Sequence, residues 1–297
     1  MSATPTLRIN DLQLSFRGYA GTVDILHGIS LHIQPGERVA LVGESGSGKS
    51  VTARIVLGLL QTLKSARISG ELEFEGRDLS AMTDRERHGL RGTAMSMIFQ
   101  DPTSSLNPVY PIDVQFLEVL RRRQPGLKIA EARAMAEKAL ADVSIPEPAR
   151  VLNSFPFQLS GGMNQRVMIA MALANEPSLL IADEPGTALD VTVQAQTLKL
   201  MRELVEQHHT SVLFISHNLG VVREFADRVY VIYKGRIVEQ GPPSALFEAP
   251  RHAYTRALIR AVPRITGGGI GEIDEDQAEF SAPIEIHSGY GEPEASR

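Results

Sequence analysis

The sequence predicts an α/β fold in which a mostly parallel sheet carries helices on both faces. Two observations support this prediction. Short apolar strands alternate with helical segments along the chain, and a glycine-rich loop separates one such strand from the helix that follows it. Parallel strands joined in this way bring their carboxyl ends to one edge of the sheet, where ligands bind in folds of this class.

Each element is predicted from its hydrophobic period or from a short apolar run. Strands are expected, in chain order, at residues 7–16, 25–33, 38–42, 70–74, 95–99, 179–182, 212–215, 229–233 and 236–239. Helices are expected at 51–60, 162–174 and 191–208, and the pattern is helical throughout 112–143. The last two strands flank Lys234-Gly235, which is typical of a hairpin turn.

The loop at 43–50 fits the phosphate-binding pattern G-x-x-x-x-G-K-[ST]. Its glycines let the backbone wrap closely around a polyphosphate, so that N–H groups point at the oxygens. Lys49 adds a positive charge for the β- and γ-phosphates, and the Ser50 hydroxyl is placed to hold Mg²⁺. A turn rich in glycine and serine is the alternative, but the helix that follows favours an anion site.

Two carboxylates follow the apolar strand at 179–182. Asp183 suits Mg²⁺, through water, and Glu184 suits the activation or orientation of an attacking water. His217 follows the next apolar strand, which predicts a position at the neighbouring strand end, within reach of a γ-phosphate. A strand end followed by an acid at a helix N-terminus is a common structural arrangement, and it would explain the two acids without a function. The presence of the phosphate loop in the same chain favours the functional interpretation.

Leu159-Ser160-Gly161-Gly162-Met163 opens a strong helix. Its backbone N–H groups and helix dipole can receive another phosphate, and Ser160 suits the N-cap position. Both roles are compatible with each other.

Composition bounds the function. The net charge of −5 argues against a nucleic-acid partner, and the absence of cysteine excludes disulfides, thiolate zinc sites and cysteine-ligated iron–sulfur clusters. The sequence contains neither a membrane-spanning run nor a signal peptide pattern, so we expect a cytosolic chain that reaches the membrane through a partner. Residues 266–297 contain eight acidic residues and one basic residue, which predicts a solvated and flexible tail.

Together these motifs resemble the nucleotide-binding subunits of ATP-binding cassette (ABC) transporters over about residues 7–262. Residues 43–50 resemble the Walker A loop, 179–184 resemble Walker B with its catalytic glutamate, and 159–163 resemble the signature motif. Gln100 matches the Q-loop, 188–190 match the D-loop, and His217 matches the switch histidine.

The resemblance implies one domain over 1–265, made of a P-loop NTPase core with a parallel sheet, an antiparallel β-subdomain and an inserted helical signature subdomain at about 101–176. It implies ATP and Mg²⁺ as cofactors, and Glu184, His217 and Gln100 as the catalytic residues. Metal ligands would be Ser50, Gln100 and Asp183. The implied nucleotide-binding residues are Phe16, Gly43, Glu44, Ser45, Gly46, Ser47, Gly48, Lys49, Ser50, Val51, Ser160, Gly161, Gly162 and Asp190.

For the adenine base, Phe16 and Tyr19 are both candidate stacking residues, because the loop at 18–23 shifts the register. The remaining alternative for Phe16 is a place in the core.

A narrower resemblance is to the ATPases of oligopeptide, dipeptide and nickel importers. It is carried by Phe99-Gln100-Asp101-Pro102, by residues 105–108 and 183–196, and by a C-terminal element at about 250–262. Many members carry a cysteine cluster, which this chain lacks. Gly186 stands where threonine is usual, and Phe157 stands where histidine is frequent. Neither position is a phosphate or metal ligand, so we expect activity to survive.

The family dimerises head to tail, so that each ATP lies between one chain's Walker A loop and the other chain's signature motif. The implied partners are a second ATPase, two membrane permeases and an extracytoplasmic solute-binding protein, at the cytoplasmic face of the inner membrane. Peptides are the expected cargo, with nickel chelates, opines, glutathione or another small solute as alternatives. A cassette ATPase acting on DNA or ribosomes, or a metabolic kinase, fits less well, because no basic surface is visible and a kinase has no use for a signature motif.

Overall fold

The computed structural model describes residues 4–19, 21–186 and 191–261. Its larger sheet has the order β10-β9-β3-β8-β7-β6. The strands β3, β6, β7, β8 and β9 pair in parallel, and β10 joins β9 as an antiparallel edge. Its strands are β3 (Arg38–Val42), β6 (Met95–Ile98), β7 (Leu179–Asp183), β8 (Ser211–Ile215), β9 (Arg228–Tyr233) and β10 (Arg236–Gly241).

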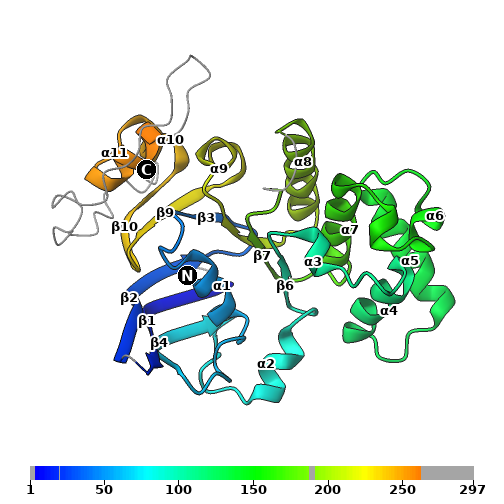
Figure 1. The fold of residues 1–297 in the computed structure, drawn as a ribbon, viewed down its shortest axis with the longest axis horizontal. Coiled ribbons are helices and arrows are strands. Elements are labelled where there is room, and N and C mark those ends of the chain that lie inside the picture. The colour runs from blue at the N-terminus through cyan, green and yellow to red at the C-terminus, as the bar shows by residue number, and fades with distance from the viewer. Residues whose placement is uncertain (1–3, 20, 187–190, 262–297) are drawn as a thin grey trace, which may run out of the picture.

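A second, antiparallel sheet has the order β2-β1-β4-β5 and lies beside the first (Figure 1). Its strands are β1 (Leu7–Gly18), β2 (Gly21–Ile33), β4 (Ala66–Phe74) and β5 (Arg77–Asp78). All nine predicted strands exist. The predicted α/β fold, with a parallel sheet and an antiparallel β-subdomain, is therefore confirmed.

The helices α3 to α7 gather on the side of the molecule away from the antiparallel sheet (Figure 1). They are α3 (Pro102–Ser105), α4 (Ile112–Arg123), α5 (Ile129–Asp142), α6 (Pro148–Leu152) and α7 (Gly161–Leu173), with a short 3₁₀ turn at Pro156–Gln158. The other helices are α1 (Lys49–Val56), α2 (Asp84–Leu90), α8 (Val191–Gln207), α9 (Leu219–Phe225), α10 (Pro243–Glu248) and α11 (Ala253–Ala261).

Two helix predictions differ from the structure. The pattern at 112–143 forms two helices, because the chain turns at Pro125-Gly126, and neither residue favours a helix interior. The helix after the phosphate loop ends at Val56 and not at Leu60. Gly58 there takes φ of +68° and donates to Ile55 O at 2.9 Å, which closes the helix C-terminus.

Each strand of the larger sheet contributes alternate side chains to two cores. On one face, Val39 and Leu41 join Ile181 and Ile215 in a core shared with α1 and the antiparallel sheet. On the other face, Ala40 and its counterparts on neighbouring strands pack with the helices α7 to α10. Burial on both faces explains the continuous apolar runs of these strands. The parallel pairing of β3, β6, β7, β8 and β9 brings the carboxyl ends of these five strands to one edge of the sheet.

Within the described residues, no helix combines the length and the hydrophobicity needed to cross a membrane.

Candidate functional site

The phosphate loop joins the end of β3 to the start of α1. Gly43, Gly46 and Gly48 have φ of +157°, +79° and +110°, which side chains rarely allow. A Cβ at Gly43 would lie 2.2 Å from Ile232 O, and one at Gly48 would lie 2.5 Å from Leu26 Cδ2. The loop conformation therefore requires glycine at these positions.

Lys49 is buried beneath this loop. Its ammonium donates to Gly43 O at 2.8 Å and to Glu44 O at 2.6 Å. Burial lowers the pKa of Lys49, against the opposing effect of nearby carboxylates. The buried hydroxyl of Ser47 has no hydrogen-bond partner within the described part of the chain. A buried cation, an unpaired hydroxyl and a glycine-lined backbone together form a fitting site for a polyanion.

Asp183 ends β7 next to the start of α1. Ser50 Oγ donates to Asp183 Oδ1 at 3.0 Å. Burial raises the pKa of Asp183, and the hydrogen bond from Ser50 opposes that shift. A hydroxyl and a carboxylate in contact are oxygen donors of the kind that Mg²⁺ prefers, so the pair fits that ion.

Glu184 follows directly and is held from both sides. Gln100 Nε2 donates to Glu184 Oε2 at 3.0 Å, and His217 Nδ1 lies 2.9 Å from Glu184 Oε1. The backbone of Glu184 has φ of +50°, and its N–H donates to Ile215 O at 2.8 Å. The contacts from Gln100 and His217 hold the carboxylate in a defined direction, and the unusual backbone conformation with the bond to Ile215 fixes the residue itself.

The three side chains come from neighbouring strands. Gln100 follows β6, Glu184 follows β7 and His217 follows β8, and these strands are paired in parallel in that order. The structure thus brings together residues that are 84 and 33 positions apart in the sequence, next to the buried acid Asp183.

The signature residues lie at the start of α7. Ser160 is the N-cap, and its hydroxyl accepts from Met163 N at 3.2 Å. Gly162 lies close to α8, because a Cβ there would be 2.9 Å from Val193 Cγ1. Residues 160–163 line an open hollow of about 570 Å³ together with Ser144, Ile145, Pro146, Arg166, Val193 and Gln196. No phosphate-loop residue lines this hollow.

The candidates for adenine stacking lie in different surroundings. Phe16 is partly buried and packs against the core beneath the antiparallel sheet, whereas the Tyr19 ring is exposed. Asp190 lies outside the described residues.

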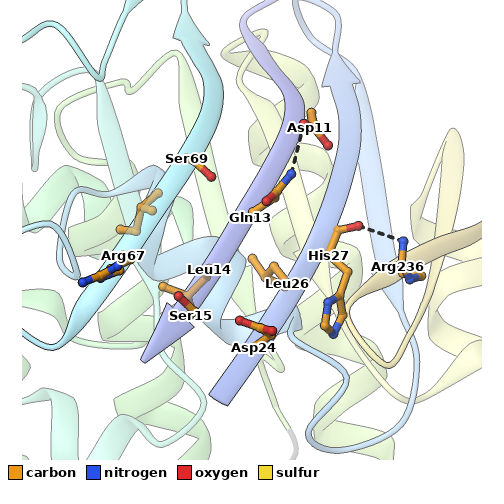
Figure 2. A pocket seen from close by; sticks show the side chains of 11 residues that line it. Asp11, Gln13, Leu14, Ser15, Asp24, Leu26, His27, Arg67, Ser69 and Arg236 are labelled. Atoms are coloured by element: carbon orange, nitrogen blue, oxygen red, sulfur yellow. Dashed lines mark hydrogen bonds between the residues drawn. The ribbon is translucent and has the colours of Figure 1, made fainter. Parts of the chain in front are cut away.

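Another hollow, of about 600 Å³, lies on the antiparallel sheet (Figure 2). Polar side chains of β1, β2 and β4 line it, and Arg236 bonds His27 O at its rim. None of the residues proposed above for phosphate, metal or catalysis lines this hollow, so it is separate from the site.

One contact with the phosphate loop was not predicted from the sequence. Tyr254, in α11, accepts a hydrogen bond from Glu44 N at 2.9 Å. The sequence signal is a tyrosine in the C-terminal element at 250–262, but nothing in that pattern indicates which part of the fold the tyrosine contacts.

Comparisons with known proteins give the family. The model of the ABC transporter family matches residues 26–187, and the model of the oligopeptide/dipeptide transporter C-terminal region matches residues 238–289. The oligopeptide transport ATP-binding protein OppD of Bacillus subtilis is 47% identical over 270 residues, which are 91% of this chain and 75% of that protein. The peptidoglycan transport ATP-binding protein YejF of Agrobacterium fabrum is 51% identical over 88% of this chain, but the chain spans only 47% of that longer protein.

A similar solved structure is the dimeric ATP-binding cassette MJ0796 in a post-hydrolysis state bound to ADP and Pi. It has a TM-score of 0.70 and 26% identity, and the match covers 80% of this chain and 98% of that one. A second similar structure is cbiO1 of Clostridium perfringens, which is part of an ABC transporter complex. It has a TM-score of 0.68 and 26% identity, and the match covers 83% of this chain and 92% of that one. On these matches and on the geometry above, the chain belongs to the ATP-binding subunits of the ABC transporter family, which are ATPases.

Proposed function

We propose that this chain hydrolyses ATP to power the import of peptides through a membrane transporter. The observation that carries the ATPase role is Glu184, fixed between Gln100 and His217 beside the buried phosphate loop. The match to an oligopeptide/dipeptide transporter region and the peptide-transporting relatives support the cargo class.

The phosphate loop and Lys49 bind the nucleotide in this proposal. The unpaired Ser47 hydroxyl and the loop N–H groups meet the phosphate oxygens, and Lys49 exchanges its two carbonyl contacts for the phosphates. Val51 and the other loop residues predicted above complete the cradle. Phe16 stays our proposal for adenine stacking, with Tyr19 as the alternative.

Ser50 and Asp183 are the proposed Mg²⁺ ligands, with Gln100 as a third. The contact between Ser50 and Asp183 supports this assignment. A bound Mg²⁺ supplies charge neutralisation for the phosphates.

Glu184 accepts the proton of the attacking water or orients it, while Gln100 and His217 fix the direction of its carboxylate. The geometry supports this assignment, because the carboxylate is 16% exposed and lies at the strand edge that carries the phosphate loop.

The other nucleotide contacts in this proposal cross a dimer interface. Ser160, Gly161 and Gly162, with Asp190, would face the ATP held by a second ATPase subunit. The hollow at the start of α7, which no phosphate-loop residue lines, supports this arrangement. Two permeases and an extracytoplasmic binding protein would complete the transporter, with this chain on the cytoplasmic face of the inner membrane.

Glu184→Gln tests the ATPase role. The amide keeps the shape and cannot take a proton, so we expect turnover to fall by about 10²–10⁴-fold while ATP still binds. The matched control is Glu176→Gln, because Glu176 flanks the opposite end of β7, also has a left-handed backbone, with φ of +47°, and has an exposed side chain. Near-normal hydrolysis by Glu184→Gln in the assembled transporter would exclude Glu184 from this role.

The cargo is tested by ATPase activity in the complete transporter reconstituted in membranes. Peptides presented by the binding protein should stimulate hydrolysis, and nickel chelates, opines and glutathione should not. Stimulation by one of these and not by peptides would identify the cargo as that solute.

A further inference from the structure

The Tyr254 side chain is fully buried, and its hydroxyl accepts the N–H of Glu44 at 2.9 Å. The two residues are 210 positions apart, and Glu44 belongs to the phosphate loop. The C-terminal helix α11 therefore contacts the loop directly with a polar group.

The hydrogen bond from Glu44 N to the Tyr254 hydroxyl fixes one particular peptide group of the loop. Glu44 N and Gly43 O belong to the same peptide group, and Gly43 O accepts from Lys49 Nζ at 2.8 Å. A trans peptide points its N–H and its C=O in opposite directions. Tyr254 thus holds one end of this peptide while Lys49 holds the other, and the orientation of the peptide determines where the Lys49 ammonium rests.

Contacts of Tyr254 and of the two residues near the start of α11 fix the position of its side chain. Its ring packs on Tyr233, with centroids 4.3 Å apart and planes at 36°. Its backbone N–H donates to His252 Nδ1 at 3.1 Å. Glu239 of β10 accepts the N–H groups of Arg251 at 2.8 Å and His252 at 3.0 Å, so the antiparallel edge strand of the larger sheet anchors the start of α11.

A second contact holds the loop near its other end. Gly235 N, in the turn between β9 and β10, donates to Ser47 O at 3.0 Å. The same hairpin carries Tyr233 and Glu239. The hairpin and α11 therefore form one frame that touches the loop at Glu44 and at Ser47.

We propose that Tyr254 is a positioning residue for the phosphate loop, so that nucleotide affinity depends on the docking of the C-terminal helix. This proposal rests on the proposed nucleotide-binding function of the loop. A loop that is already ordered loses no further conformational entropy when the ligand binds, so the ligand binds with higher affinity.

The alternative is that Tyr254 only packs in the core and its hydroxyl merely finds a partner, as buried tyrosines usually do. Tyr230 provides the matched control. It is also buried, at 1% exposed, and its hydroxyl also accepts a backbone N–H, from His32 at 3.3 Å, but it makes no contact with the phosphate loop among the described hydrogen bonds.

The experiment compares Tyr254→Phe with Tyr230→Phe in the full chain. We measure the Kd of ATP and the hydrogen exchange of the peptide that contains Glu44. Tyr254→Phe should raise the Kd about threefold to tenfold, as expected for one hydrogen bond to a neutral acceptor, and should speed exchange at Glu44. Tyr230→Phe should change neither quantity, although it loses a similar bond. Glu239→Gln should shift both in the same direction as Tyr254→Phe, by less.

An unchanged Kd and unchanged exchange in Tyr254→Phe would overturn the proposal, and so would an equal rise of the Kd in both tyrosine variants. A wild-type chain whose ATP binding is no tighter than that of Lys49→Ala would instead refute the nucleotide site itself. In that case exchange at Glu44 still decides whether Tyr254 orders the loop.

Discussion

Two regions present groups suited to a phosphate: the carboxyl ends of the parallel strands, called the strand edge below, which carry Glu184, and the start of α7, which carries Ser160. They differ in how many of their contacts come from this chain alone. At the strand edge, Glu184 is held by residues of two neighbouring strands, and Asp183 pairs with Ser50. At the start of α7, the Ser160 hydroxyl serves its own helix, and the hollow beside it is open.

The difference indicates a division of labour. The side chains that follow the carboxyl ends of the parallel strands are fixed when the chain folds, because the pairing of the strands sets their positions. We propose that the helix start at the open hollow is completed by a second molecule. The proposed pairing of the Ser160 region with a second subunit's nucleotide follows from this contrast, and the predictions below test it.

Among the variants that test this contrast, Ser160→Arg should have the largest effect. In the proposed dimer, Arg at this position would fill the space of a partner's γ-phosphate, so hydrolysis by the assembled transporter should fall by about 10²–10³-fold, as when a group that stabilises the transition state is lost. Nucleotide binding by the single chain should be unchanged, because the phosphate loop is elsewhere. Ser160→Ala is the control, since it removes the N-cap hydroxyl without filling the hollow and should cost mainly stability.

The same variant also tests whether the site is shared. In a complex of a Ser160→Arg chain with a Lys49→Ala chain, one composite site carries both changes and the other carries neither. Activity should return relative to either pure variant. Where the native pair is a heterodimer, the two changes are placed in its two subunits. Normal hydrolysis by Ser160→Arg alone would refute the role of the signature region.

Lys49→Ala should weaken ATP binding by at least about tenfold, because it removes the charge that meets the phosphates. This variant breaks the strand-edge site within one chain, so the loss should be visible without a partner, unlike the loss in Ser160→Arg. Nucleotide titration of the isolated chain measures it. Lys64→Ala, at an exposed position beyond α1, is the control. Equal affinity in both lysine variants would contradict the role of Lys49.

The same contrast explains what the sequence could predict. The spacing of residues predicts the phosphate loop, because its glycines and Lys49 lie close together in the chain. The apolar runs at 179–182 and 212–215 predict neighbouring strands whose ends carry Glu184 and His217, and β7 does pair with β8 in parallel. Their functional roles stay predictions.

Contacts between distant elements could not be predicted in the same way. The bond between Tyr254 and Glu44 depends on where α11 docks, and no periodicity in the sequence specifies that position. The end of α1 was also predicted wrongly, since the apolar residues after Val56 continue the pattern while Gly58 closes the helix. Local patterns give elements and adjacent motifs, but docking has to be read from the structure.

A smaller effect is expected from acid. Burial lowers the pKa of His252; the nearby carboxylate of Glu239 opposes this shift, and the charge of Arg256 adds to it. Below pH 6.5 the unfolded chain therefore binds a proton that the folded chain still excludes. Stability from this group is complete above pH 6.5 and is lost as the pH falls through the folded pKa. Protonation of Nδ1 would also remove the acceptor of Tyr254 N.

His252→Asn isolates this effect, because the Asn oxygen can replace Nδ1 as the acceptor and does not titrate. The Tm of the wild type should fall more between pH 7.5 and pH 5.5 than the Tm of the variant. Burial also lowers the pKa of His32, but that contribution is common to both proteins and cancels in the difference. Parallel pH profiles would show that His252 does not contribute.

The smallest effect is expected from truncation after Ile265, at the boundary that the composition predicts. The residues that follow lie outside the described residues. They are acidic and poor in apolar side chains, so we expect that they bury too little surface to offset the entropy of ordering them. The ATPase rate of the truncated chain in the assembled transporter should equal that of the full chain. The match to the oligopeptide/dipeptide C-terminal region runs to residue 289, so the truncation removes part of a region that this chain shares with that family. If truncation lowers the yield of folded protein, residues beyond 265 pack on the core. If truncation lowers only the ATPase rate within the transporter, these residues act on a partner. They would then be a third region that affects hydrolysis, besides the site around Glu184 and the hollow at the start of α7.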